Sequence, residues 1–127
     1  MDAATLLSRD RFAAALGARL VVDEPGRVVV EMTVSEMHLD ESGEVSSGAL
    51  FALADCAMSL ISNADVTAVA VATHFVRHGT AAPGQIVTAD ARPAMRADGP
   101  ERTWDIPLTV GDACVARFVG TTLTLSR

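Results

Sequence analysis

The chain has 127 residues, half of them hydrophobic, so it is long enough to bury a core and too apolar for a disordered protein. It carries a formal net charge of −6, contains no lysine, and has ten scattered arginines. Polyanions are bound by clustered basic side chains, so these charges exclude a general nucleic-acid binder. We expect a single domain over residues 1–127.

The sequence also lacks the signals of membrane, secreted and metal-binding proteins. Its longest apolar stretch, residues 49–61, is too short and too polar to span a bilayer. The first residues have neither the basic start nor the apolar run of a secretory signal, so we expect a cytoplasmic protein with no membrane partner. Cys56 and Cys114 form no CxxC pair, and the three histidines are not spaced as ligands. We therefore expect two reduced, buried cysteines, no metal and no cofactor.

The N-terminal part of the chain predicts a short helix followed by a β-hairpin. Residues 5–16 have an apolar side at helical spacing, and Gly17 supplies a stop. The apolar period then changes to two, and residues 19–23 and 27–34 predict two strands. The Pro-Gly pair between them suits a type II turn, whose second central residue needs a positive φ.

The middle of the chain predicts one long helix. Residues 37–45 are polar and contain glycine, which is typical of a loop. Residues 47–63 then predict a helix that Ser46 or Ser47 can cap and Asn63 can close. This helix is apolar almost all round, so it should be buried on most of its faces.

Four strand-like segments follow the helix: 68–78, 85–95, 102–110 and 113–125. Turns at 97–100 and 111–112 separate the last three. Pro107 lies on the face opposite the alternating apolar side chains, which indicates an edge strand or a bulge. The gaps are too short for the helices of a parallel sheet. We therefore predict an α+β fold in which an antiparallel sheet wraps around one long central helix.

Asp55 is the anomaly of the long helix, because a carboxylate among apolar neighbours is costly unless it has a partner. Helical spacing places Ser59 and Ser62 on the same face, and Gly48 starts this polar stripe. A polar stripe on an apolar helix predicts a small polar cavity beside it. Spacing alone leaves two interpretations equally open, a hydrogen-bonded structural aspartate and a functional carboxylate.

Residues 39–55, LDESGEVSSGALFALAD, resemble a motif of the hotdog acyl-CoA thioesterases of the phenylacetate-degradation and 4-hydroxybenzoyl-CoA types. In that motif an Asn-Pro-x-Gly-type loop leads to His-Gly-Gly and then to a Leu-Phe-x-Leu-Ala-Asp helix. THFVR at 73–77 and GTT at 120–122 are similar to the inner and last strands of the family, and the resemblance spans residues 15 to 125. It implies a hotdog fold, hydrolysis of an acyl-CoA substrate to free acid and CoA, and a homodimer or homotetramer.

The resemblance also implies roles for individual residues. Asp55 takes the place of the catalytic carboxylate, acting as general base on water or as nucleophile. Ser47 takes the position whose backbone N–H polarises the thioester carbonyl at a helix N-terminus. Ser59 matches a hydroxyl that orients the water, and Asp40 matches an amide position near the carbonyl or water. The family shares such a site between the aspartate of one subunit and the N–H of the other.

Two departures from the motif affect this assignment. The family's His-Gly-Gly is replaced by Ser46, Ser47 and Gly48, which keeps the N–H donor and loses the imidazole that Ser46 imitates only in part. Asp40 stands where the family has Asn or Gln, so if Asp40 and Asp55 lie close, one pKa should rise. These departures motivate an alternative, a non-catalytic hotdog protein that binds acyl-CoA. A hotdog dehydratase or hydratase ranks lower, because it would want an Asp/His pair.

Arginine and histidine supply the remaining candidates. Arg77, Arg92 and Arg96 could hold the phosphates of CoA, since Arg pairs well with phosphate, and we expect Arg77 or Arg92 to contribute. The alternative for each arginine is a solvated charge at a strand end. His74 and His78 have no Ser or Cys arranged with them as a triad, which favours histidines at the surface or rim.

Overall fold

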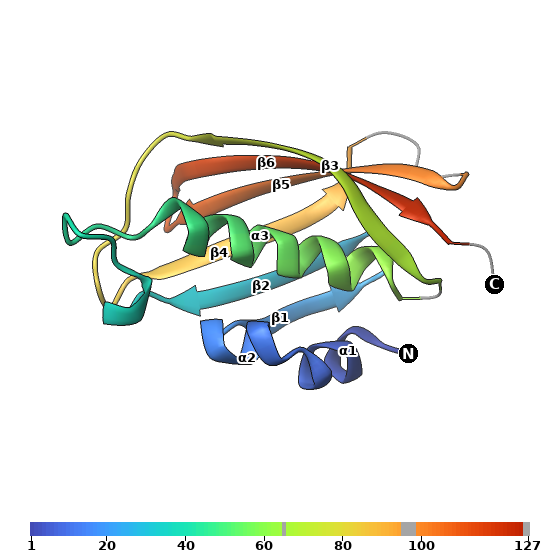
Figure 1. The fold of residues 1–127 in the computed structure, drawn as a ribbon, viewed down its shortest axis with the longest axis horizontal. Coiled ribbons are helices and arrows are strands. Elements are labelled where there is room, and N and C mark those ends of the chain that lie inside the picture. Colours follow the sequence, from blue (N-terminus) through green and yellow to red (C-terminus); the bar gives the residue numbers. More distant parts are fainter. Residues whose placement is uncertain (65, 95–98, 126–127) are drawn as a thin grey trace.

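A computed structural model describes residues 1–64, 66–94 and 99–125 of the chain (Figure 1). Six strands form one sheet in the order β1-β2-β4-β5-β6-β3, and every neighbouring pair is antiparallel. The strands are β1 (Arg19–Glu24), β2 (Arg27–Thr33), β3 (Ala68–Arg77), β4 (Ile86–Pro93), β5 (Glu101–Val110) and β6 (Ala113–Thr124). The six strands predicted from the sequence are thus confirmed, with ends that differ by one to two residues.

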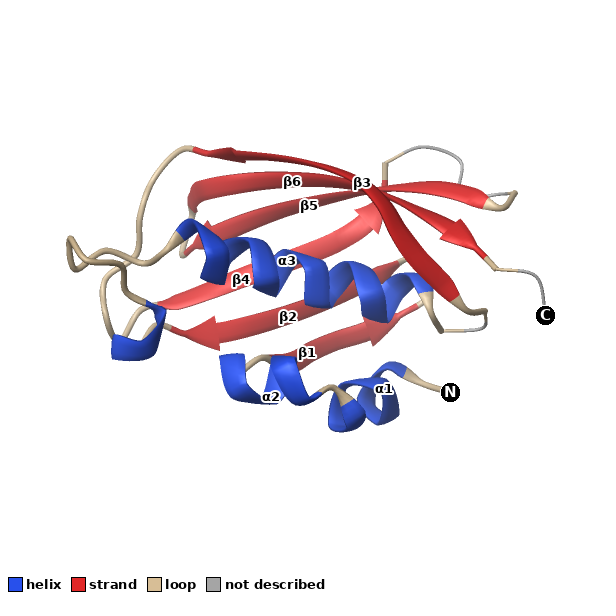
Figure 2. Cartoon of the chain, viewed as in Figure 1, coloured by secondary structure: helices blue, strands red, loops and turns tan. Residues whose placement is uncertain are grey.

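The long helix α3 (Ser47–Ser62) lies across the concave face of this sheet (Figures 1 and 2). Its apolar side chains are buried against β2, β4, β5 and β6, as expected for a helix that is apolar almost all round. The approach is close: a Cβ added at Gly120 of β6 would collide with the Sδ of Met58. Within the described ranges, no helix is long and apolar enough to cross a membrane.

The N-terminal segment forms two short helices where the sequence predicted one. These are α1 (Ala3–Arg9) and α2 (Arg11–Leu16). Asp10 separates them, because its backbone is extended and its Oδ1 accepts a hydrogen bond from the Ala13 N–H at 2.9 Å. An aspartate that caps a new helix ends the preceding one. Gly17, with a φ of 84°, ends α2 as predicted.

A buried histidine ties these helices to the start of α3. His38 closes a short 3₁₀ helix, η1 (Glu36–His38), and is only 4% exposed. Its Nε2 donates to the carbonyl oxygen of Leu16 at 2.7 Å, and its Nδ1 accepts from the Ser35 N–H at 3.0 Å. Its own carbonyl oxygen accepts from the Ser46 N–H at 2.7 Å. His38 is therefore a structural residue that positions the loop before α3.

Two expectations about individual residues were met only in part: an edge strand or a bulge at Pro107, and burial of both cysteines. Pro107 does not lie on an edge strand, because β5 runs between β4 and β6. Its missing N–H is accommodated by irregular pairing, with a bulge against β6 after Leu108. Cys114 is exposed, whereas Cys56 is buried as expected, and both are free thiols. Cys114 follows the turn that begins β6, where side chains do not yet reach the core.

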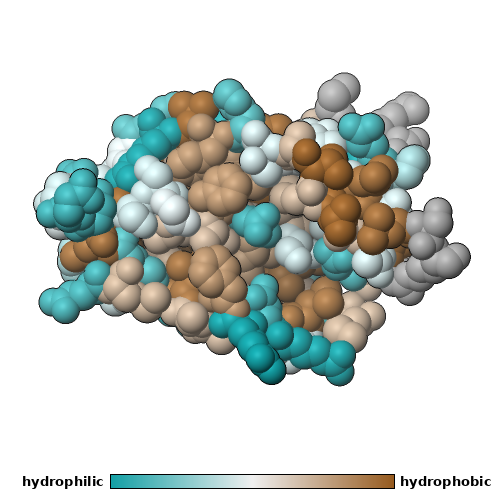
Figure 3. Space-filling model, viewed as in Figure 1, coloured by the Kyte–Doolittle hydropathy of each residue, from teal (hydrophilic) through white to brown (hydrophobic). Residues whose placement is uncertain are grey.

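Strand β3 is an edge strand with apolar side chains exposed to solvent. It pairs with β6 on one side, and no described strand pairs with its other side. Val69, Val71 and Val76 are between 39% and 53% exposed, and Leu123 and Leu125 at the end of the chain add to the apolar surface. Figure 3 shows a hydrophobic cluster over this part of the molecule. Exposed apolar side chains along an unpaired strand edge indicate a contact site.

Candidate active site

The first turn of α3 presents backbone N–H groups at the surface. Just before the helix, Ser46 accepts hydrogen bonds from the Ala49 N–H through Oγ at 3.0 Å and from the Leu50 N–H through its carbonyl oxygen at 3.3 Å. The N–H groups of Ser47 and Gly48 have no acceptor within the described residues, and both residues are exposed. The positive end of the helix dipole therefore faces solvent with two free donors.

Arg77 of β3 lies against this first turn. Its Nη1 donates to the Oγ of Ser47 at 3.1 Å. Its Nε donates to the carbonyl oxygen of Gly79 at 2.8 Å, and its Nη2 donates to the Oγ1 of Thr80 at 3.2 Å. The guanidinium is thus held beside the positive end of α3. A fixed cation next to free N–H donors suits an anionic or polarised ligand.

Asp40 fastens the loop that leads to α3. Its Oδ1 accepts three hydrogen bonds, from the Ser42 N–H at 2.8 Å, the Ser42 hydroxyl at 2.6 Å and the Glu44 N–H at 3.2 Å. The bond from the Ser42 hydroxyl, the two backbone bonds and the charge of Arg77 hold the pKa of Asp40 below its usual value. Asp40 is therefore an ionised carboxylate whose Oδ1 is occupied by the loop.

Asp55 lies two turns further along α3 and is half-buried. Its carboxylate makes no hydrogen bond or ion pair with any described residue. Burial raises its pKa above the ordinary value of 3.8, and the negative charge of Asp10 raises it further. Within the described residues, nothing therefore supports the interpretation of Asp55 as a hydrogen-bonded structural aspartate.

A small cavity lies beside Asp55, between α3 and the strands β3 and β6, where the polar stripe of α3 predicted one. It has a volume of about 130 Å³ and is lined by Asp55, Met58, Ser59, Ser62, Asn63, Ala68, Ala70 and Thr122. The Ser62 hydroxyl donates to the Met58 carbonyl oxygen at 2.6 Å, whereas the Ser59 hydroxyl has no partner among the described residues. The volume suits a few water molecules and is too small for an acyl thioester.

Asp10 is a residue near the site that the sequence did not reveal. It belongs to the junction of α1 and α2, which pack on α3, and its charge acts on both Asp55 and Cys56. Burial and these two carboxylates raise the pKa of Cys56 to about 12. Cys56 is therefore a protonated thiol at neutral pH and is no nucleophile. The only sequence feature that could have pointed to Asp10 is an acidic residue inside a helical pattern. An exposed helix face gives the same pattern, so the feature is not specific.

The two groups of candidate residues do not meet within one chain. Ser47 and Asp55 are eight residues apart on α3, which is about 12 Å along the helix axis at 1.5 Å per residue. One thioester carbonyl cannot contact both groups at that distance. The condition under which Asp40 and Asp55 would shift one pKa does not arise within one chain, because Asp10 is the carboxylate that acts on Asp55.

The arginines predicted to bind CoA are separated by the sheet. Arg92 lies on the outer face of β4, opposite the buried alanines of that strand, and its Nε is 3.4 Å from the Asp90 carboxylate. Arg96 lies outside the described residues. Of the two arginines that are described, Arg77 alone lies at the first turn of α3.

The histidines and acidic residues form no metal site in the part of the chain that the structure describes. No group of three or more His, Cys, Asp or Glu side chains is placed there to hold an ion. His74 and His78 are exposed, as expected for histidines at the surface. His38 is buried with both ring nitrogens hydrogen-bonded, so it is not available as a ligand or base.

Comparisons with known proteins identify relatives of the same fold. No family model matches the chain. It is 34% identical to a Deinococcus radiodurans protein named "Putative esterase" over 87% of this chain and 76% of the relative. The structure of the E. coli PaaI protein from the phenylacetic acid degradation operon matches with a TM-score of 0.92 and 28% identity, covering 98% of this chain and 91% of that one. A variant of the phenylacetic acid degradation protein PaaI from Thermus thermophilus matches at 0.87 and 33%, covering 91% and 100%. These likenesses confirm the hotdog fold.

Proposed function

Because the chain belongs to the family of PaaI-type hotdog thioesterases and esterases, we propose that it hydrolyses an acyl-CoA thioester to the free acid and CoA. The observation that carries the proposal is Asp55, a half-buried carboxylate with a raised pKa and no partner among the described residues, beside a cavity of water size. We place the reaction in the cytoplasm, since both cysteines are unpaired thiols.

Asp55 acts as the general base in the proposed mechanism. A raised pKa makes it a stronger base than an ordinary aspartate, and the Ser59 hydroxyl can help to hold a water molecule beside it. Asp55 takes a proton as the water oxygen bonds to the thioester carbon. The carbon–sulfur bond then breaks, and CoA leaves as a thiolate that takes up a proton. In the alternative, the Asp55 carboxylate bonds directly to the thioester carbon as the carbon–sulfur bond breaks and CoA leaves, and water then hydrolyses the resulting anhydride to the free acid.

The oxyanion is stabilised by the first turn of α3 from a second copy of the chain. Free N–H groups at a helix N-terminus suit a developing negative charge, and those of Ser47 and Gly48 are exposed. Asp55 of the same copy lies too far along the helix to share a carbonyl with them. The reaction therefore requires a homodimer, or a homotetramer made of such dimers.

The edge strand β3 supplies the surface for this dimer. Its outer edge has no described partner strand, and its valines are exposed. Ala68 and Ala70 of β3 also line the Asp55 cavity, so a copy paired along β3 would lie next to the carboxylate. CoA would bind at Arg77, whose guanidinium is held at the first turn of α3.

A non-catalytic acyl-CoA-binding protein is the second candidate function. It is favoured by the two departures from the family motif. The Ser46 hydroxyl oxygen accepts a hydrogen bond in capping α3, so it replaces the missing imidazole only in part, through its remaining O–H donor. Asp40 is an ionised carboxylate where the family has an amide, and negative charge there opposes an oxyanion. Release of free thiol from a panel of acyl-CoAs separates this candidate from the enzyme.

The substitution Asp55→Asn tests the proposed chemistry. An amide keeps the size of the side chain but takes up no proton and does not attack a carbonyl. We expect the variant to fold and assemble normally and to lose at least ~100-fold in kcat, the scale of a general-base contribution. Asp105→Asn, on the outer face of β5, is the matched control and should keep its turnover. Undiminished turnover in a folded Asp55→Asn variant would refute the mechanism.

A further inference from the structure

A second, larger cavity lies at the C-terminal end of α3, on the other side of the helix from the Asp55 cavity. It has a volume of about 450 Å³, which is typical of a site for a small organic molecule. Its walls come from the β1–β2 hairpin, the end of α3 and the adjoining ends of β4 and β5: Asp23, Glu24, Pro25, Gly26, Val28, Ile61, Ala64, Pro93, Arg102 and Trp104. It shares no lining residue with the Asp55 cavity, so it is a separate site.

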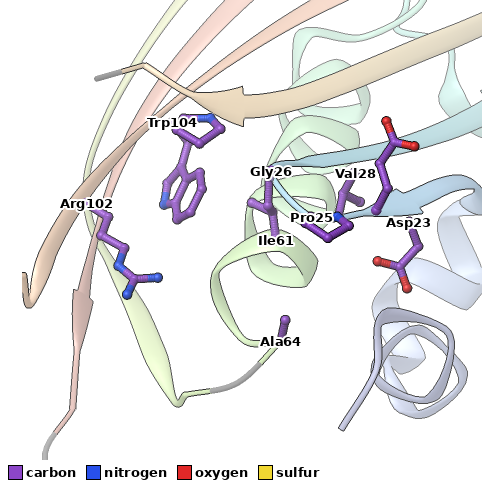
Figure 4. A pocket seen from close by; sticks show the side chains of 10 residues that line it. Asp23, Pro25, Gly26, Val28, Ile61, Ala64, Arg102 and Trp104 are labelled. Atoms are coloured by element: carbon purple, nitrogen blue, oxygen red, sulfur yellow. The ribbon is translucent and has the colours of Figure 1, made fainter. Parts of the chain in front are cut away.

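Arg102 is the unusual residue of this cavity. Side chains two apart on a strand share a face, so Arg102 lies on the same face of β5 as the buried Trp104 and Ile106. Figure 4 shows its guanidinium directed into the space below the indole of Trp104. Its Nε is buried and has no hydrogen-bond acceptor among the described residues. No hydrogen bond or ion pair joins its terminal nitrogens to another described residue either, so the end of the guanidinium that borders the cavity is free to bind an anionic group.

The rest of the cavity favours a ligand with an apolar body. Trp104 forms one wall, and Ile61, Val28 and Pro25 form others. The indole is fixed, because its Nε1 donates to the Oγ1 of Thr122 at 2.9 Å. Because Trp104 is only 3% exposed, most of the apolar surface open to a ligand comes from Ile61 and Pro25.

The acidic residues of the rim set the orientation of the ligand. Glu24 forms an ion pair with Arg27, with 4.0 Å between the charged atoms. Asp23 lies across the cavity from Arg102 (Figure 4). A ligand with negative charge at both ends would be repelled by Asp23, whereas one with a single anionic end can place it at Arg102.

From this arrangement we infer that the cavity binds a small monocarboxylic acid with an aromatic or branched apolar body. The carboxylate accepts hydrogen bonds from the two terminal nitrogens of Arg102, and the body packs on Ile61 and Pro25. A single guanidinium fork matches a planar carboxylate better than a phosphate, which would favour a second cationic side chain that the described lining does not offer. The inference is independent of the thioesterase reaction, because the residues concerned are distinct from the Asp55 site.

The fluorescence of Trp104 gives a direct test. The chain has one tryptophan and no tyrosine, so the emission reports this cavity wall alone. The full-length protein is titrated with 3-phenylpropanoate, its amide and 3-phenylpropylamine. The acid should give a saturable change, and the amide should bind at least ~10-fold more weakly, as expected for the loss of a charge-assisted hydrogen bond. Equal binding of acid and amide, tighter binding of the amine, or no saturable change would overturn the inference.

Three variants locate the binding. Arg102→Gln should weaken the acid by at least ~10-fold, and Ala64→Phe should block the cavity without touching the guanidinium. Arg117→Gln, which removes an arginine from the outer face of β6, is the matched control and should bind as the unmodified protein does. The indole N–H resonance of Trp104 confirms that each variant is folded. Unchanged affinity in both Arg102→Gln and Ala64→Phe would place the acid elsewhere and refute the site.

Discussion

The first turn and the middle of α3 belong to one helix, but they present opposite chemical environments. At the first turn, the Ser46 hydroxyl and Asp40 are hydrogen-bonded, and Arg77 adds positive charge beside two free N–H donors. At the middle, the carboxylate of Asp55 is half-buried, without a described partner and with a raised pKa. In the proposed mechanism, one region stabilises negative charge and the other accepts a proton. Such complementary regions are useful to catalysis only if they meet, and one helix holds them about 12 Å apart.

The largest effect is expected from removing the N–H at the first turn. Ser47→Pro deletes this donor at the one helical position where proline is well tolerated, and the extended Ser46 suits a following proline. We expect kcat to fall by ~100- to 1,000-fold, the scale of one lost oxyanion donor. Ser47→Ala keeps the N–H and loses the hydroxyl bonded to Arg77, so steady-state assays should show a much smaller loss. Equal losses in the two variants would mean that the hydroxyl, and not the backbone N–H, is used.

Arg77 should affect the binding of CoA more than the chemistry. Arg77→Gln removes a cation held at the first turn, so KM for acyl-CoA should rise by roughly 10-fold, as for a lost charged hydrogen bond. A short thioester without the nucleotide should show a much smaller rise. Arg92→Gln is the control, because Arg92 lies on the outer face of β4 and pairs with Asp90. Equal effects on both substrates would argue against a phosphate contact.

The smallest expected effect concerns the charge near Asp55. Asp10→Asn removes a negative charge and retains a good helix cap. Loss of a like charge favours the ionised form, so the pKa of Asp55 should fall. The acid limb of the pH profile of kcat/KM should therefore move to lower pH, while the plateau at high pH stays the same. Because burial is the larger cause, the limb should remain above that of an ordinary aspartate. An unmoved limb would show that Asp10 does not act on the essential base.

Much of the fold followed from patterns that depend on local sequence. A long helix that is apolar all round has to be surrounded, and six short strands with brief connections can surround it only as an antiparallel sheet. The polar stripe at Asp55 predicted the cavity for the same reason. The break at Asp10 was not predicted, because one side-chain hydrogen bond decides it within an otherwise helical pattern.

What could not be predicted depends on distances between elements that are remote in sequence. Arg77 and Arg92 look alike in the sequence, and only the order of the strands separates one at the first turn of α3 from the other on the outer face. In the sequence, Arg102 likewise resembles an ordinary charge at a strand end. Only the structure shows that β5 places it beside Trp104 in a cavity. Cys114 was expected in the core and is exposed, because burial begins only with the following residue.

The central claim, that the two regions of α3 meet across a dimer, is tested most directly by mixing two inactive variants. Asp55→Asn lacks the base and Ser47→Pro lacks the N–H donor, so each alone should have little activity. Half of the randomly mixed dimers contain both chains, and each of these carries one complete site of two, which predicts about a quarter of the unmodified activity. Light scattering before and after subunit exchange checks that dimers form. Recovery to this level supports a site shared between copies, and a mixture of folded, exchanging dimers that stays inactive would contradict it.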